Sequence, residues 1–553
     1  MKRPPTALNI RVLFPVMLLL MLTFLESCRN GKKEHVPPNV LFIAIDDLND
    51  WAGYLGGHPD ALTPNLDRLA GQSTVFTSAH ASATACQPSR NSLLWGLHPV
   101  TTGWYENLWN RQELDRVTDS IRKISVALPH YFREQGYRTM VAGKVFHHGP
   151  ADGTGLEREF WDEILPEYSV SREFRERGNN YGGPFYYPFP AGGSQVIRKL
   201  GPGVPGHSLC GGPLDREKDI PGGEMPDEYA ARWAIEKLSA GYDTPFFLAI
   251  GFVRPHVPYT APAAFFESFR GKEVQVPRVP GDEMADVPVY GKAMAMGFLP
   301  GGDHHAVLKM GSGIWDANRA ALGNGIGTGN GNGEDYWTWL VRCYLSCVSF
   351  TDHQVGKVLD ALEQSPYRDN TIVVLWSDHG QQLGEKKMWR KMCLWEESTR
   401  VPLLIKKPGQ QGGSEVDAPV SLLDIYPTLV ELAGLPGPGN LEGNSLVPLI
   451  QHPDTPWDRP VLTSWQYGNF AVRSRDWRYI RYRDGTEELY DHRSDPGEHT
   501  NLAGDPGFEE IMAGHRKHIP DTVADRFFKP FQGDQLDGWV ALWDSAGIPG
   551  WLR

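Results

Sequence analysis

The chain has few cysteines, no excess of basic charge and no long apolar run beyond residue 30. It has six cysteines in 553 residues, with no CxxC pair and no Cys/His spacing typical of zinc ligands. Neither a disulfide framework nor a structural zinc site is therefore expected. Lys and Arg total 54 against 67 Asp and Glu, a formal charge of −13, which argues against nonspecific nucleic-acid binding. A Walker loop and a GxSxG nucleophile elbow are also missing from the sequence.

The first 28 residues have the pattern of an export signal. A basic start precedes an apolar run at 12–25, which is shorter than the about 20 residues that a membrane-spanning helix needs. The next residues, LESC at 25–28, resemble a bacterial lipobox with Cys28 as the lipidated residue, although Glu26 replaces the usual small residue. We expect an exported protein, either a periplasmic or cell-surface lipoprotein or a simply secreted one. Cys28 is then its only predicted link to a membrane.

Apolar strands alternate with helical patterns over residues 36–450. Strands buried on both faces of a parallel sheet are predicted at 40–45 (VLFIAI), 139–142, 246–252 (FFLAIGF) and 371–376 (TIVVLW). A helix is expected to begin at Thr63-Pro64, and further helices are predicted at 120–135, 227–240 and 337–364. The glycine-rich stretch 323–333 reads as a loop. This alternation predicts an α/β fold, a large and mostly parallel sheet flanked by helices.

The pattern changes after residue 450. Short strands with turn signals between them are predicted at 461–465, 469–473, 477–483 and 487–490, followed by a helix near 508–518. We therefore expect a smaller C-terminal subdomain built on an antiparallel sheet. The chain divides into the export signal at 1–28, the α/β domain at 36–450 and the C-terminal α+β subdomain at 451–553.

Polar residues with chemical potential follow the ends of the predicted strands. Ligand crevices in open α/β sheets lie outside the carboxyl ends of the strands. Residues that follow these ends are Asp46 and Asp47, Lys144 and His147, His256, and Asp378 and His379. Adjacent aspartates are ordinarily solvated turn residues. Three carboxylates brought together repel one another unless a cation lies among them, and their hard oxygens favour Ca²⁺ or Mg²⁺.

The most specific pattern is CQPSRNSLLWG at residues 86–96. It matches the signature C-x-P-S-R-x-x-x-L-x-G at every fixed position, and a chance match is on the order of one in ten thousand. On these residues the chain resembles the type I sulfatases of the alkaline-phosphatase superfamily. The resemblance implies that Cys86 is oxidised by a maturation enzyme to formylglycine. The hydrated aldehyde attacks sulfur through one hydroxyl and expels sulfate through the other.

A closer resemblance, over about residues 38–500, is to the iduronate-2-sulfatase branch. Its motifs occur in the same order as NVLFIAIDDLND, TPNLDRLA, ACQPSR, AGKVFHHG, RPHVPY, SDHGQQLGEKKMWRK and ELYDHRSDPGEHTNLA. One departure is Gln381, where an aromatic residue is expected. This departure bears on which sugar is recognised and leaves the chemistry unaffected.

The resemblance implies a role for each site residue. One Ca²⁺ is expected between Asp46, Asp47, Asp378, His379 and an oxygen of modified Cys86. Arg90 would fix the formylglycine hydroxyl, and His147 would bond the nucleophile. Contacts to the sulfate oxygens are expected from Lys144, His256 and Lys391, and His256 would protonate the leaving alcohol as general acid.

Simpler interpretations remain open for single residues. Lys144 alone would be an ordinary solvated lysine. His256, between two prolines, would cap a strand, and His147 or His148 would be an ordinary loop residue. Lys391 could belong to an exposed basic patch with Lys386, which we place on the rim of the site. Two other functions also remain. One is phosphate or phosphonate ester hydrolysis within the same superfamily, and the other is non-catalytic binding of sulfated glycans by a surface lipoprotein.

The expected partner is a sulfated oligosaccharide or glycosaminoglycan fragment. A basic pocket within an acidic protein suits one sulfate group better than a long polyanion, which would need an extended basic groove. The resemblance points the same way, to the 2-O-sulfate of a terminal uronic acid. We therefore expect an exo-acting enzyme in glycosaminoglycan degradation.

Overall fold

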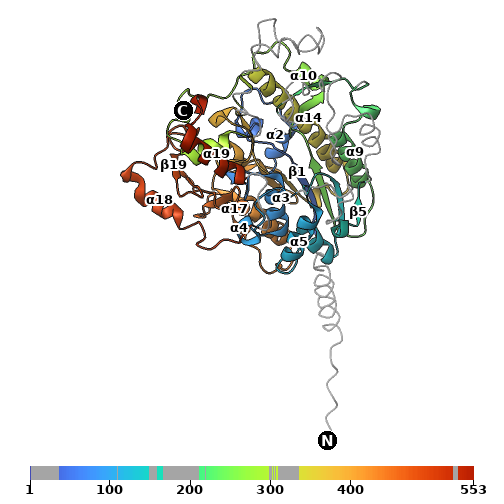
Figure 1. Ribbon diagram of the computed structural model, residues 1–553. Helices are drawn as coiled ribbons and strands as arrows, with labels where there is room; N and C mark the ends of the chain where they lie inside the picture. The colour runs from blue at the N-terminus through green and yellow to red at the C-terminus, as the bar shows by residue number, and fades with distance from the viewer. Residues whose placement is uncertain are drawn as a thin grey trace.

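The structure is a computed structural model (Figure 1) that describes residues 1, 37–108, 110–147, 158–165, 209, 211–217, 219–297, 302, 304, 307–308, 336–526 and 533–552. Residues 2–28 of the predicted export signal and the glycine-rich stretch 323–333 lie outside the described part. In the described part of the chain, no helix is both long enough and apolar enough to cross a membrane.

The centre of the fold is an eight-stranded sheet. Its strand order is β14 (Ser414–Val416), β2 (Thr74–Phe76), β13 (Leu403–Lys406), β9 (Thr371–Ser377), β1 (Asn39–Ile45), β7 (Phe246–Phe252), β4 (Arg138–Gly143) and β5 (Glu163–Ile164). β1 pairs in parallel with β7 and β9 along its length. β13 alone in this sheet runs antiparallel to its neighbours. The predicted mostly parallel sheet is confirmed.

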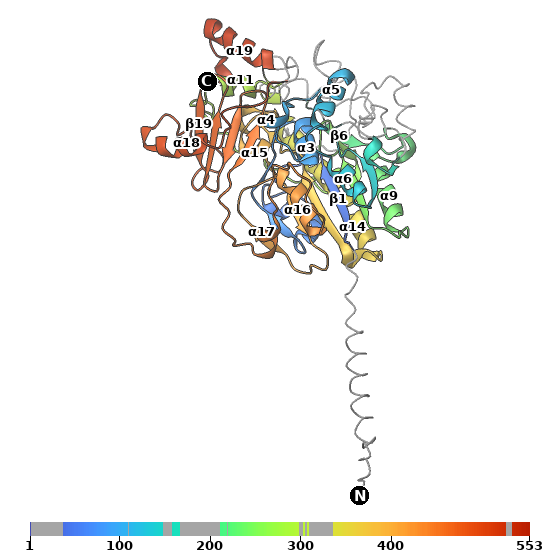
Figure 2. The ribbon, with the colours of Figure 1, turned by 90° about the horizontal axis from the view of Figure 1, so that it is seen from below.

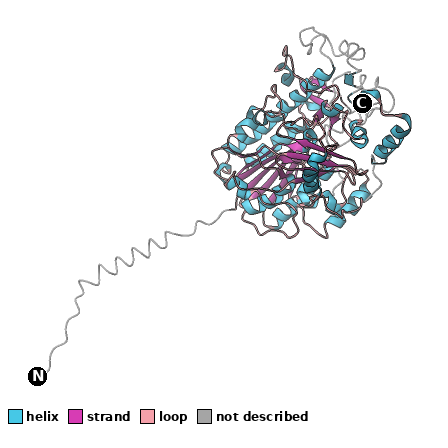
Figure 3. Ribbon diagram, turned by 90° about the vertical axis from the view of Figure 1, so that its left-hand side faces the viewer, coloured by secondary structure: helices cyan, strands magenta, loops and turns pink. Residues whose placement is uncertain are grey.

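Helices cover both faces of this sheet (Figure 3), as the continuous apolar runs require. Leu41, Ile43 and Ile45 of β1 pack into one core, with α2 (Pro64–Ala70), α9 (Pro226–Leu238), α10 (Ala264–Glu267) and α14 (Tyr336–Gln364). The alternate residues Val40, Phe42 and Ala44 pack into the other core, with α3 (Cys86–Trp95), α5 (Arg111–Ile121), α6 (Leu128–Glu134), α16 (Ile425–Leu432) and α17 (Val447–Gln451).

A second sheet follows in the chain and is antiparallel, as predicted. Its strands are β16 (Val461–Ser464), β17 (Phe470–Arg473), β18 (Trp477–Arg481) and β19 (Glu487–Asp491). It lies beside the main sheet (Figure 2), with α18 (Glu509–Arg516) packed on one of its faces. The opposite face contacts α11 (Val289–Ala295), α19 (Gly533–Ala546) and the segment before α15 (Glu396–Thr399).

The remaining elements are short. Small sheets join β3 (Ala79–His80) with β12 (Arg400–Val401) and β15 (Val420–Ser421), β6 (Gly211–Leu214) with β8 (Tyr259–Pro262), and β10 (Gln382–Leu383) with β11 (Trp389–Arg390). One further α-helix is α4 (Pro99–Thr102). Single 3-10 turns are η1 (Gly53–Leu55), η2 (Arg158–Phe160), η3 (Pro221–Gly223), η4 (Arg368–Asn370), η5 (Glu385–Lys387), η6 (Leu422–Asp424), η7 (Pro506–Phe508) and η8 (Gly550–Leu552).

The helix predicted at 120–135 is wrong. α5 ends at Ile121, and α6 begins only at Leu128, after the extended residue Ala127. Pro129 sets this start, because a proline lacks the backbone N–H that positions beyond the first helical turn must donate.

Cysteines contribute no disulfide among the described residues. Cys86, Cys347 and Cys393 are free and buried, and Cys343 and Cys347 pack within α14.

Two glycines let β4 and β7 approach closely next to the polar edge of the sheet. Gly143 has a φ of +69°, and a β-carbon there would lie 2.0 Å from the carbonyl oxygen of Gly251. A β-carbon on Gly251 would lie 1.9 Å from the carbonyl oxygen of Lys144. The Lys144 N–H donates to the Gly251 carbonyl at 2.9 Å. The glycine pair therefore fixes where Lys144 leaves the sheet.

Replacing Gly251 by alanine tests this close approach. We expect Gly251→Ala to lower the free energy of unfolding by about 1–3 kcal/mol, because backbone atoms must move apart, and to lower activity by displacing Lys144. Chemical denaturation measures the first effect. Gly241→Ala is the control, because a β-carbon there meets no atom within 4 Å. Equal stability of the two variants would contradict the argument.

Candidate active site

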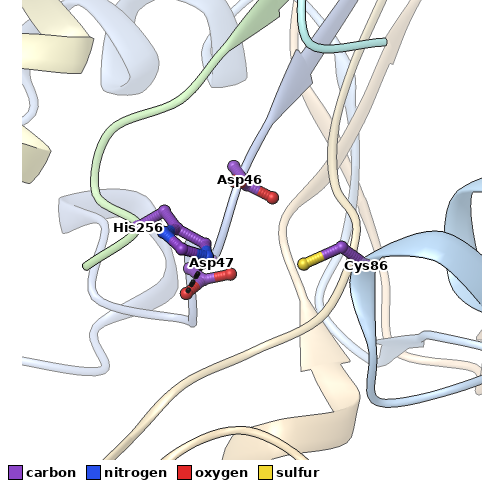
Figure 4. Close-up of side chains that lie close together, drawn as sticks. All are labelled: Asp46, Asp47, Cys86 and His256. Carbon is purple, nitrogen blue, oxygen red and sulfur yellow. Dashed lines mark ion pairs between the residues drawn. The ribbon is translucent and has the colours of Figure 1, made fainter. Parts of the chain in front are cut away.

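The carboxyl ends of β1, β4, β7 and β9 bring the predicted residues together. Asp46 continues the sheet beyond β1, since its N–H donates to the Phe252 carbonyl at 3.1 Å. The Asp378 N–H donates in turn to the Ile45 carbonyl at 3.3 Å. Figure 4 shows the carboxylates of Asp46 and Asp47 and the sulfur of Cys86 pointing toward one another, with His256 beside Asp47. The predicted convergence of strand ends is therefore observed.

Three buried carboxylates are paired with three buried cations. Arg90 donates from Nη2 to Asp46 at 3.0 Å and from Nε to Asp378 at 2.7 Å. Asp46 also accepts a hydrogen bond from Lys144. Lys391 Nζ lies 2.7 Å from both oxygens of Asp47. Each of the six side chains is 5% exposed or less. Such pairing is required, because an unpaired buried charge is strongly destabilising.

The pKa values of the two adjacent aspartates, Asp46 and Asp47, shift in opposite directions. Burial alone would raise the pKa of Asp46, but Lys144, His256, Arg90 and Lys391 together hold it well below its usual range. Burial raises the pKa of Asp47, and the neighbouring Asp46 and Asp378 add to this effect despite Lys391. Of these two aspartates, Asp47 therefore gains more from an additional positive charge.

Cys86 is the first residue of α3, where the free N–H groups of a helix favour negative charge. Its Sγ lies 3.2 Å from His379 Nε2. Burial raises the pKa of the thiol to about 12, although Lys144 and Lys391 oppose the shift. The thiol is consequently protonated at neutral pH and is a poor nucleophile without chemical modification.

The two histidines of the site have defined tautomers. His379 Nδ1 lies 3.0 Å from the Gly380 carbonyl, and His256 Nδ1 lies 2.6 Å from the Val257 carbonyl. Because a carbonyl only accepts, Nδ1 carries the proton in both rings. Nε2 is then the ring atom that each histidine turns to the site. For His379 this atom lies 3.6 Å from Asp47 and from Asp378.

These side chains fit a divalent cation. Ligand atoms of Asp46, Asp47, Cys86 and His256 lie within 4.8 Å of one another, and so do those of Cys86, Asp378 and His379. The three carboxylates and the imidazole nitrogens of these two groups, which share Cys86, form a donor set for a hard or borderline metal ion. His256, predicted to contact sulfate, also belongs to this group.

The structure brings nine of the ten predicted site residues together. Cys86, Arg90, Lys144, His256, Lys391, Asp46, Asp47, Asp378 and His379 share the charged centre. His147 is half-buried three residues after Lys144, and its contact with the nucleophile stays a prediction.

The segment that carries Lys391 has an unusual backbone. Lys386, Lys387, Arg390 and Met392 have φ values of 52°, 50°, 74° and 80°. Left-handed non-glycine residues cost on the order of 1 kcal/mol each and persist only where surrounding contacts impose them. Residues 384–396 therefore depend on contacts from outside the segment.

These contacts come from the C-terminal sheet and the loop after it. Arg478 of β18 donates to the Leu394 carbonyl at 3.0 Å and forms ion pairs with Glu396 and Glu498. Trp395 Nε1 donates to Glu488 of β19 at 2.9 Å, and the Glu396 N–H donates to Glu498 at 2.9 Å. The sequence analysis did not identify these anchors, because they pair residues about eighty to one hundred positions apart with no local signal.

The placement of Lys386 on the rim is wrong. Lys386 is 2% exposed, donates to the Glu498 carbonyl and to Tyr490, and lies 4.8 Å from the centre of the Tyr490 ring. It is one of the anchors of the segment. Its neighbour Lys391 points instead to Asp47, so these two lysines do not form one exposed basic patch.

Comparison with known proteins gives a consistent result. Residues 38–435 match the family described as Sulfatase, and residues 384–525 match the family described as N-sulphoglucosamine sulphohydrolase, C-terminal. A sulfatase of Formosa agariphila is 37% identical over 518 residues, 92% of each protein. Iduronate 2-sulfatase of Mus musculus is 28% identical over 484 residues, 79% of this chain and 76% of the relative. The solved phosphonate monoester hydrolase of Silicibacter pomeroyi has a TM-score of 0.65 at 21% identity, over 87% of this chain and 94% of its own.

Removal of a carboxylate or of the metal tests the proposed cation site. Asp378→Asn should lower sulfate release by about 100-fold or more, the range for loss of one key electrostatic group. Exhaustive chelation should lower the rate of sulfate release by the wild-type protein to a similar extent, and added Ca²⁺ should restore the rate. Asp243→Asn, at an exposed position, is the control. Elemental analysis checks that the chelated enzyme is free of metal. Full activity of the metal-free enzyme would contradict the metal assignment.

A lysine pair tests the role of Lys391. Lys391→Ala should lower the rate about 100-fold, since it removes a buried cation next to the reacting centre, whereas the exposed Lys123→Ala should leave it unchanged. Steady-state kinetics on one sulfate ester measures both, and circular dichroism checks the fold. A similar rate for the two variants would contradict a role at the site.

Proposed function

This chain belongs to the sulfatase family and hydrolyses sulfate esters, and from that premise we propose that it removes O-sulfate from a sulfated sugar, with formylglycine made from Cys86 and one bound Ca²⁺. One observation carries the proposal. Cys86 stands at the start of α3, in a buried group with Asp46 and Asp47, and Lys144 and Lys391 donate to these two carboxylates.

Each residue of the site has a separate role in the proposed reaction. Hydrated formylglycine at position 86 supplies the hydroxyl that attacks sulfur and the second hydroxyl whose deprotonation releases sulfate. Arg90 holds Asp46 and Asp378 in place and lies one helical turn from Cys86. Lys144 and Lys391 offer ammonium groups to the sulfate oxygens, where they stabilise charge during in-line displacement.

His256 is proposed as the general acid for the leaving alcohol. Its Nδ1 proton is engaged by the Val257 carbonyl, so Nε2 is the atom that takes up and releases the transferred proton. Burial and the nearby Lys391 and Lys144 lower the pKa of His256 well below its usual value. An anionic sulfate ester beside these lysines offsets their field and raises the pKa again. Protonation of His256 is therefore coupled to substrate binding.

Ca²⁺ is proposed between Asp46, Asp47, Asp378 and His379, with an oxygen of residue 86. When bound, it supplies a fixed positive charge beside the sulfuryl oxygens. The Lys391 and Lys144 ammonium groups keep Asp47 and Asp46 oriented toward the same point.

The proposed substrate is a sulfated oligosaccharide or glycosaminoglycan fragment with 2-O-sulfate on a terminal uronic acid. Its support is the similarity to iduronate 2-sulfatase, at 28% identity, and the confinement of the site's cations to one buried centre. We also propose that the protein is exported, with Cys28 as a lipid anchor, and that a formylglycine-generating enzyme matures it.

Phosphonate or phosphate ester hydrolysis is the second candidate, because a phosphonate monoester hydrolase shares the fold. Turnover of 4-nitrophenyl sulfate and of a 4-nitrophenyl phosphonate ester by one preparation separates the two. Faster phosphonate turnover would favour the second candidate.

The nucleophile is tested at residue 86. Cys86→Ala should abolish sulfate release and keep the melting temperature within a few degrees, because only a small buried side chain changes. Mass spectrometry of the peptide containing residue 86 should show formylglycine in the wild-type protein. Substantial turnover by the alanine variant would reject the mechanism, and an unoxidised Cys86 in the native host would favour a glycan-binding protein.

Exo action is tested by product mapping. A tetrasaccharide with sulfate on both internal and terminal sugars should lose only the sulfate of the end sugar, because the cations of the site are buried and paired with three neighbouring carboxylates. Chromatography with mass spectrometry identifies the product. Release of the internal sulfate at a comparable rate would indicate an open-cleft polysaccharide sulfatase.

A further inference from the structure

A pocket lies on the C-terminal side of Lys391. Three parts of the chain line it. Met388 and Met392 come from the segment that carries Lys391, Trp465 and Gln466 come from the turn between β16 and β17, and Trp539 comes from α19. The pocket is partly open to solvent. Because Lys391 lines this pocket and also binds Asp47, the pocket adjoins the charged centre.

Gln466 is the unusual residue of this pocket. Its side chain is 2% exposed, and within the described structure neither its Oε1 nor its Nε2 has a hydrogen-bond partner. Its φ of 55° lies in the left-handed region. The turn is fixed around it, since Asn469 donates to the Trp465 carbonyl at 3.1 Å and the Trp465 N–H donates to the Asn469 carbonyl at 3.2 Å. A buried amide without partners is rare and calls for a ligand or water.

The chemistry of the walls limits what that ligand is. One amide offers a donor and an acceptor side by side, which matches two neighbouring hydroxyl groups. Trp465 and Trp539 offer apolar ring surface, which suits the C–H face of a sugar, and the two methionines adapt their shape readily. Among the described residues lining the pocket, Lys391 is the one charged side chain, and it is already paired with Asp47. A second sulfate or carboxylate would therefore lack a counter-charge here.

We propose that this pocket binds an uncharged sugar ring next to the sulfated sugar, and that Gln466 hydrogen-bonds two of its hydroxyl groups. The inference rests on the proposed function and narrows its substrate. The enzyme then prefers a terminal sulfated sugar linked to a neutral ring over one linked to a sulfated ring.

Two probes test the pocket. They are a 2-O-sulfated uronic acid monosaccharide and the same sugar linked to unsulfated N-acetylglucosamine. The unmodified enzyme should have a higher kcat/KM on the disaccharide. Gln466→Leu should lower that value about tenfold, mainly through KM, as expected for loss of one or two neutral hydrogen bonds, and should leave the monosaccharide rate unchanged. Gln112→Leu, at an exposed position, should change neither.

A charged ring and the melting temperature give independent readouts. A 6-O-sulfate on the second sugar should remove the disaccharide's advantage. Gln466→Leu should melt no lower than the unmodified protein, because it removes a buried amide without partners, and Gln466→Glu should show the same loss on the disaccharide. A clear fall in the melting temperature of Gln466→Leu, or an equal loss of kcat/KM on both probes, would overturn this inference. The proposed function would still stand. If the unmodified enzyme hydrolyses neither probe, the proposed substrate fails and the inference fails with it.

Discussion

The balance of buried charge at the carboxyl edge of the main sheet is the constraint on which the rest of the site depends. Asp46, Asp47 and Asp378 are fully buried, and each accepts a hydrogen bond from Arg90, Lys144 or Lys391. Loss of one partner leaves a buried charge without compensation, at a cost of several kcal/mol. The carboxylates proposed to hold a cation and the lysines proposed to contact sulfate therefore position each other.

The third cation links the two sheets. Lys391 stands in a segment with four left-handed non-glycine residues, and Arg478, Glu488 and Glu498 hold that segment in place. The main sheet supplies the carboxylates, and the C-terminal part of the chain supplies the contacts that keep one of their counter-charges in position. The antiparallel sheet is consequently part of the active site's support, although none of its strands carries one of the predicted site residues.

Sequence reasoning was strongest where one local pattern determines the structure. The apolar runs predicted β1, β7 and β9 almost to the residue, and the polar residues after them meet as expected. It was wrong at 120–135, where Pro129 starts a new helix, and at Lys386, which has no local feature that separates a buried anchor from an exposed lysine. Arg478 and the histidine tautomers were out of reach, because their partners are distant in sequence or are backbone carbonyls placed by the fold.

Gln381 is the residue at which the chain departs from the iduronate 2-sulfatase motifs. The resemblance to iduronate 2-sulfatases favours an aromatic residue here, yet the glutamine side chain is fully buried and donates from Nε2 to the Tyr259 hydroxyl. Its backbone carbonyl accepts from Asn49 at 3.1 Å. These two contacts tie Gln381 to Tyr259 and to the segment after β1. The wall that holds Trp465, Gln466 and Trp539 beside Lys391 has the mixed polar and aromatic surface that a sugar ring requires.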